Sequence, residues 1–144
     1  MTSFLDLRLK DFPFHTEIPT RWGDNDMLGH LNNVVYNRMI ETVVVRFTLG
    51  PLGVDWQKDQ CYPLVIESLC RFHRPLSFPE TVTAGLRATR LGGSSVNYEI
   101  GLFGEGHDVP AATGHFIHVF IDRDTHKSVQ IPDAIRDLIE ANAM

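Results

Sequence analysis

The chain has 144 residues, a mass of 16.3 kDa and 43% hydrophobic residues, which is the size and composition of one globular domain. Eighteen Asp and Glu residues against thirteen Lys and Arg residues give a net charge of −5 and a pI near 5.7. Since proteins that bind polyanions carry the opposite charge, we expect neither nonspecific nucleic-acid binding nor binding to an anionic membrane surface. A few arginines can still hold one small phosphorylated ligand.

Three features of the sequence bear on its cellular location: the N-terminal residues, the length of its apolar stretches and its cysteines. Residues 1–10 mix charged and apolar side chains and lack the uninterrupted apolar stretch of an export signal. No window approaches the roughly 18 apolar residues of a membrane-spanning helix. Cys61 and Cys70 are nine residues apart, so on one strand they would point to opposite faces, and we expect no internal disulfide. The sequence therefore predicts a cytoplasmic protein with two reduced thiols.

The first two expected elements are a strand and a long helix. Residues 16–22 suit a short strand, and Pro19 within it favours the edge of a sheet. Residues 34–47 place apolar side chains at i, i+3, i+4 and i+7, which predicts a helix that Asn32 or Asn33 can cap. Its broad apolar sector leaves only a narrow polar flank, as expected for a helix that other elements enclose on most sides.

Four longer strands and a short helix follow. Period-two alternation predicts half-buried antiparallel strands, and Gly92-Gly93 reads as a tight hairpin turn between two of them. A closing helix over residues 131–143 begins at Pro132. This order predicts an α+β fold with a five-stranded antiparallel sheet wrapped around one central helix, and the open sheet edges favour a homo-oligomer. The four strands are expected over residues 64–74, 81–89, 95–102 and 110–122.

The densest polar stretch, residues 21–33, lies between the first strand and the long helix. A loop that runs into a helix N-terminus offers unpaired N–H groups that can stabilise an anion or a developing oxyanion. A carboxylate in such a loop could attack a substrate or activate water. The same Asp and Asn residues also suit simple turns and caps, so the composition of the stretch leaves both interpretations open.

The pattern Arg-Trp-x-Asp-x-Asp-x-x-Gly-His-x-Asn-Asn-x-x-Tyr over residues 21–36 resembles the signature of the hotdog-fold acyl-CoA thioesterases of the 4-hydroxybenzoyl-CoA thioesterase family. The order of elements also matches that fold, so the resemblance covers nearly the whole chain. It implies hydrolysis of an acyl-CoA thioester to a free acid and CoA, without a metal or other cofactor. It also implies a homodimer with a continuous sheet across the interface, or a homotetramer.

The resemblance implies that Asp26 is the catalytic carboxylate, as nucleophile or as general base toward water. An ordinary Asp is ionised at pH 7 and a thiolate leaves readily, so this chemistry requires no unusual pKa. His30 could orient water or bind the substrate. Asn33 belongs to the region whose backbone N–H groups polarise the thioester carbonyl. Asp24 instead suits hydrogen bonding within the loop.

Five further positions are expected to bind the substrate. Tyr36 also suits the core, and Glu41 could instead pair with Arg38 one helical turn earlier. Arg90 stands before the Gly-Gly turn and is preferred for the CoA phosphates over Arg74, for which a solvated strand face is expected. The five positions are Gly29, Asn32, Tyr36, Glu41 and Arg90.

Other functions stay open at this point. Hotdog hydratases and dehydratases use a Gly-Asp-x-Asn-Pro-x-His segment, but residues 23–30 lack the Pro and have a spacing one residue longer, which favours hydrolysis. A noncatalytic acyl-CoA binder could share the fold, although Asp26 argues against it. The thioester could also be carried by an acyl carrier protein. His115 and His118 would point to opposite faces of a strand, so we predict no metal site.

Overall fold

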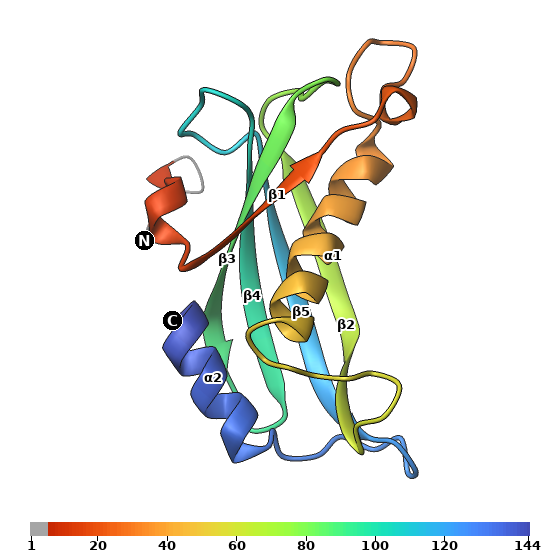
Figure 1. Cartoon of the computed structure of the whole chain (residues 1–144), viewed down its shortest axis with the longest axis vertical. Helices are drawn as coiled ribbons and strands as arrows, with labels where there is room; N and C mark the ends of the chain where they lie inside the picture. The colour runs from red at the N-terminus through yellow and green to blue at the C-terminus, as the bar shows by residue number, and fades with distance from the viewer. Residues whose placement is uncertain (1–5) are drawn as a thin grey trace.

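The computed structural model describes residues 6–144, in which five strands form one antiparallel sheet of order β1-β3-β4-β5-β2. Strands β3, β4 and β5 form a meander, and β1 and β2 are the two edges. The helix α1 lies across one face of the sheet. The helix α2 packs beside β3, at the end of the sheet away from the start of α1 (Figure 1). The bounds are β1 Phe14–Pro19, α1 Asn33–Leu49, β2 Cys61–Phe72, β3 Thr81–Leu91, β4 Ser95–Phe103, β5 Ala112–Asp122 and α2 Asp133–Ala143.

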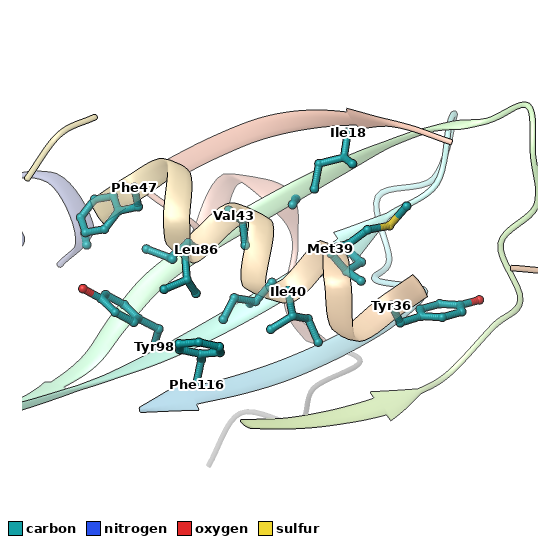
Figure 2. Close-up of a cluster of buried hydrophobic side chains, with 14 of the residues drawn as sticks. Ile18, Tyr36, Met39, Ile40, Val43, Phe47, Leu86, Tyr98 and Phe116 are labelled. Atoms are coloured by element: carbon teal, nitrogen blue, oxygen red, sulfur yellow. The ribbon is translucent and has the colours of Figure 1, made fainter. Parts of the chain in front are cut away.

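The core lies between α1 and the sheet. Figure 2 shows side chains of α1 pointing down onto strand residues such as Leu86 and Phe116. The apolar stripe predicted for the helix is buried, with Ile40 and Phe47 completely inaccessible to solvent. At Gly114 of β5 a Cβ atom would lie 2.6 Å from the Ile40 side chain, so only glycine lets α1 approach the sheet this closely. The predicted sheet wrapped around a central helix is therefore confirmed.

The element boundaries follow the predictions with one clear displacement. The first strand begins at Phe14 and ends at Pro19, because the chain then turns into a short 3₁₀ helix, Trp22–Asp24. The predicted extension of that strand to residue 22 is wrong. Its predicted place at an edge is confirmed, since β3 is the one strand of the described sheet with which β1 pairs.

The predicted orientation of the two cysteines is wrong. Cys61 pairs with Asp122 and Cys70 with Gly114, positions eight apart on β5, so both thiols lie on the same face of β2. The cause is an extra residue in a β-bulge between Val65 and Glu67, which reverses the alternation. Both thiols are free and pack against the core. Their separation along the strand, roughly 27–30 Å, is itself too long for a disulfide.

The outer face of the sheet is partly covered by the N-terminal segment. Leu7 and Phe12 pack on Phe103 in a small cluster apart from the main core. Beside it, Arg87 and Glu99 form an ion pair at 2.7 Å. This cover explains why parts of β4 are buried on both faces. No helix within residues 6–144 has the length and apolar character needed to cross a membrane.

Candidate active site

The loop between β1 and α1 forms a small hairpin at one end of the sheet (Figure 1). Asn25 and Leu31 form an antiparallel bridge at its base. Inside the bridge, the Asp26 N–H donates to the carbonyl of His30 at 2.8 Å, and the Gly29 N–H donates to the carbonyl of Asp26 at 3.0 Å. Gly29 has a φ of 78°, a left-handed conformation that favours glycine. The turn therefore fixes where Asp26 lies.

A second segment, residues 76–78 between β2 and β3, holds this hairpin in place. The Leu31 N–H donates to the carbonyl of Leu76 at 2.8 Å, and the Ser77 hydroxyl donates to the carbonyl of Gly29 at 3.0 Å. The Leu76 N–H in turn donates to the hydroxyl of Tyr36 at 2.9 Å. The loop and the first turn of α1 are thus bonded to one common support.

Asp24 connects the loop to the helix α1 through hydrogen bonds of its carboxylate. Its side chain is buried, and Arg38 donates to both carboxylate oxygens at 3.1 Å. Arg21 also donates to both, with its guanidinium to Oδ1 at 3.1 Å and with its backbone N–H to Oδ2 at 2.8 Å. Burial raises the pKa of Asp24, but the hydrogen bonds from Arg38 and Arg21 outweigh that effect and hold the pKa at about 2. Asp24 therefore stays ionised and structural. The ion pair with Arg38, which was the alternative role for Glu41, is not formed among the described residues, because Arg38 binds Asp24 instead.

Asp26, two residues away, has the opposite surroundings. Its carboxylate is exposed at the wall of a cavity. One oxygen, Oδ1, accepts from the Leu28 N–H at 2.9 Å. Across the described residues 6–144, Oδ2 receives no hydrogen bond. One oxygen thus fixes the carboxylate while the other is available for chemistry.

The first residue of α1 has an available backbone donor. The Asn32 side chain accepts from the Val34 N–H at 3.0 Å, and the Asn32 carbonyl accepts from the Val35 N–H at 2.9 Å. The N–H of Asn32 donates to the carbonyl of Asp24. Among residues 6–144 the Asn33 N–H finds no acceptor. Within the region predicted to polarise the carbonyl, the Asn33 N–H is thus an available donor at the positive end of the helix.

A cavity of about 300 Å³ brings most of these groups together. The end of β2 and the chain beyond it supply a second wall, which the sequence patterns did not indicate. Arg74 belongs to that wall, so the solvated strand face expected for it is wrong, and its buried Nη2 has no hydrogen-bond partner among the described residues. The lining residues are Asp26, Leu28, His30, Leu31, Asn33, Tyr36, Phe72, His73, Arg74 and Pro75.

The other predicted binding residues lie outside this cavity. Gly29 and Asn32 shape the turn and cap the helix instead of forming the wall. Glu41 lies two turns further along α1, on its exposed side. Arg90 is nine residues beyond Thr81, which pairs with the residue just before the loop, so it lies about 30 Å away at the other end of β3. One chain alone does not bring Arg90 to the cavity.

Comparison with known proteins shows the family to which the chain belongs. Residues 20–139 match the family model of the Thioesterase-like superfamily. The chain belongs to this superfamily. Its fold is accordingly the hotdog fold, as the resemblance implied.

Solved structures of other proteins are similar to this chain over nearly their whole length. The PA5185 protein from Pseudomonas aeruginosa strain PAO1 is 39% identical, with a TM-score of 0.89 over 95% of this chain and 96% of that one. The PA2801 protein from Pseudomonas aeruginosa is 34% identical, with a TM-score of 0.81 over 89% and 98%. A thioesterase from Thermus thermophilus, complexed with coenzyme A and Zn, is 28% identical, with a TM-score of 0.77 over 90% and 93%.

The zinc of that Thermus complex raises the question of a metal site in this thioesterase-like chain. Within residues 6–144, no three His, Cys, Asp or Glu side chains gather closely enough to hold a metal ion. His118 faces the core, whereas His115 pairs with Leu69 on the outer face, so the two histidines point apart as expected. The described donors therefore form no cluster of the kind that a metal ion requires.

Proposed function

We propose that the protein is an acyl-CoA thioesterase of the 4-hydroxybenzoyl-CoA thioesterase type, which hydrolyses an acyl-CoA to a free acid and CoA. The observation that carries the proposal is the pair of unoccupied groups at one cavity, the Asp26 Oδ2 and the Asn33 N–H. A thioester between them would have a carboxylate on one side and an oxyanion donor at a helix N-terminus on the other. This is the arrangement that acyl transfer requires.

In the proposed reaction the thioester carbonyl oxygen accepts from the Asn33 N–H, and the helix dipole stabilises the negative charge that develops on it. Asp26 Oδ2 either attacks the carbonyl carbon or takes a proton from a water that attacks it. The C–S bond breaks and CoA leaves as a thiolate. In the covalent route, water then hydrolyses the Asp26 anhydride. Both routes consume one water and yield one acid and one thiol.

Two other lining residues have supporting roles in this proposal. His30 is exposed beside Asp26 and is suited to orient the attacking water. The Tyr36 hydroxyl already accepts from the Leu76 N–H, and only 3% of the residue is exposed, which supports a role in shaping the wall. Arg74, with an unpartnered guanidinium nitrogen among the described residues, is the nearest candidate for an anionic part of the substrate.

The proposal includes a homodimer. In the part of the chain that the structure describes, β2 pairs with β5 alone, which leaves its other edge for a second copy. Large apolar side chains are exposed on β2 and on the neighbouring side of α1, as expected of a surface that a partner covers. In such a dimer Arg90 could reach a CoA phosphate only from the other subunit. The cytoplasmic location of the protein stays a prediction. The exposed apolar residues are Val34, Leu49, Leu64, Val65, Ile66, Leu69 and Phe72.

The experiment is thiol release from short, long and aromatic acyl-CoAs by the wild type and by Asp26→Asn, which keeps the side-chain shape and removes the charge. We expect the variant to lose about 10²–10⁴-fold in kcat. The chain offers a matched control, because Asp55 makes the same hydrogen bond to the N–H two residues on, at 2.9 Å to Gln57. Asp55→Asn should keep wild-type turnover. Absence of turnover on every ester, or full activity of Asp26→Asn, would contradict the proposal.

A further inference from the structure

A groove runs along α1 and β2, away from the cavity that holds Asp26. It consists of two adjoining hollows of about 330 and 260 Å³, which share Glu41, Val65 and Phe116. The first hollow begins at Val34, next to Asn33 of the catalytic cavity. We call these two hollows the α1–β2 groove. The groove is lined in part by the exposed apolar residues of β2 and α1 that the partner covers in the proposed homodimer, so the partner would close it into a channel. An acyl chain that leaves the reacting carbonyl along α1 would enter this channel.

The hollow nearer the catalytic cavity includes polar side chains, whereas the far hollow is mostly apolar and holds one buried polar group. The polar residues of the nearer hollow are Asn37, Arg38, Glu41 and Ser68. Val45, Leu49 and Trp56 surround the far end of the groove. His118 of β5 also lines it, although only 5% of this residue is exposed. Within residues 6–144, no group satisfies the Nδ1 atom of His118. A groove whose far, apolar end contains a buried imidazole nitrogen without a partner is suited to a ligand with a polar end.

The surroundings of His118 keep the imidazole neutral. Aromatic rings pack against it, with centroids at 5.0 Å for Phe116, 6.1 Å for Tyr98 and 6.4 Å for Trp56. Phe116 and Tyr98 lie beneath α1 in Figure 2. This burial lowers the pKa of His118 to about 4. A neutral imidazole has one nitrogen that donates a hydrogen bond and one that accepts a hydrogen bond. Rotation of the ring by 180° about Cβ–Cγ exchanges the positions of nitrogens and carbons, so His118 can present a donor or an acceptor to the groove.

The length of the path sets the size of the ligand. Phe72, which lines the catalytic cavity, pairs with Ala112, and His118 lies six residues further along β5 on the same face. At the usual rise of a strand this separation is about 20 Å. A short or simple aromatic acyl group attached at Asp26 would not reach His118. A medium or long chain would.

We infer that the preferred substrate is a long acyl-CoA whose far end carries a hydroxyl or carbonyl oxygen that hydrogen-bonds to His118. The inference rests on the proposed thioesterase function and adds the substrate class to it. A site that hydrogen-bonds a substrate oxygen discriminates against the analogue without it, because the buried imidazole is then left unsatisfied.

The test compares a straight-chain acyl-CoA with its ω-hydroxy counterpart of equal length, by kcat/KM, and the two free acids by binding affinity. We expect the wild type to prefer the hydroxylated form of each by about tenfold. His118→Phe, which keeps a ring of similar shape, should remove the preference, whereas His118→Gln should keep part of it. His115→Phe is the matched control, since His115 lies on the same strand but on the outer face.

The binding measurement keeps the two proposals separable. Turnover of both esters at equal rates, equal affinity for both acids, or a preference that survives in His118→Phe would overturn the inference while the thioesterase function stands. If no ester is hydrolysed, the proposed function fails. The affinities of the two acids for the wild type and His118→Phe then still decide whether the groove recognises a polar chain end. Thermal unfolding of each variant shows that it is folded.

Discussion

The core beneath α1 and the loop that precedes α1 are held together by different forces. The core consists of buried, mostly apolar side chains, whose removal from water stabilises the fold. The loop exposes most of its side chains and depends on hydrogen bonds to residues 76–78 and on the buried Asp24. The core therefore supplies stability, whereas the loop uses part of that stability to hold a carboxylate and a backbone donor at one cavity.

Within the loop the same contrast recurs between two carboxylates two residues apart. Asp24 is buried, fully bonded and bound to two arginines. Asp26 is exposed, with one oxygen unbonded by any described residue. Chemical type alone does not separate them. Their surroundings do, and substitutions on each side of the contrast should affect different properties.

The largest effect on stability is expected in the core. Phe47→Ala removes a ring that is completely buried and packs against Phe14 and Tyr98. We expect the free energy of unfolding to fall by about 3–5 kcal/mol, because the variant loses buried area and leaves a cavity. Denaturant-induced unfolding of the wild type and the variant measures this change. A loss below about 1 kcal/mol would show that α1 is not the centre of the core.

A pH effect of nearly similar size is expected from His118. Its pKa is about 4 in the folded protein against 6.5 in the unfolded chain, so the unfolded chain binds more protons between these values. Stability should therefore fall by up to about 3 kcal/mol as the pH drops from about 6.5 to about 4. His118→Phe should remove most of this slope and His115→Phe should not. Chemical unfolding at a series of pH values gives the result, and equal slopes in both variants would count against it.

Asp24 should have a smaller effect in a lower pH range. The folded pKa of about 2 lies below the unfolded value of 3.8, so Asp24 contributes stability above about pH 4 and loses it as the pH falls toward 2. Asp24→Asn should cost about 2 kcal/mol at pH 7 and should make the acid-induced loss shallower. The same unfolding series measures both quantities. An unchanged profile would mean that the arginines do not stabilise the folded loop through this carboxylate.

The smallest of the expected effects concerns Tyr36. Tyr36→Phe leaves the Leu76 N–H without its acceptor, and we expect a loss of about 1–2 kcal/mol in stability with KM unchanged. Thermal unfolding and steady-state kinetics on one acyl-CoA separate the two readouts. A raised KM at unchanged stability would instead assign the hydroxyl to the substrate.

The sequence was sufficient to predict the fold because its signals are local and repeated. The helical stripe from Val35 to Phe47 and the alternation along β3 and β4 each repeat over several turns or residues. The β-bulge at Val65 and Glu67 has no such signal, and it reversed the expected orientation of Cys61 and Cys70. A single inserted residue is decided by packing, not by pattern.

The site was predictable only in part. Residues 21–36 placed Asp26, His30 and Asn33 at one loop, and the structure brings all three to one cavity. The wall from Phe72 to Pro75 comes from a strand far away in the sequence, so only the tertiary fold reveals it. Which N–H of the helix start remains available depends on how the Asn32 side chain and carbonyl are used, and composition does not show this.

The most direct test of the central claim places Asp26→Asn and Asp24→Asn side by side, with thiol release from an acyl-CoA and unfolding free energy measured for both. Asp26→Asn should lose nearly all turnover and keep wild-type stability, within about 0.5 kcal/mol. Asp24→Asn should lose stability and retain far more turnover per folded molecule than Asp26→Asn. Equal losses of turnover in the two variants, or turnover lost only in Asp24→Asn, would contradict the division of roles between the two carboxylates.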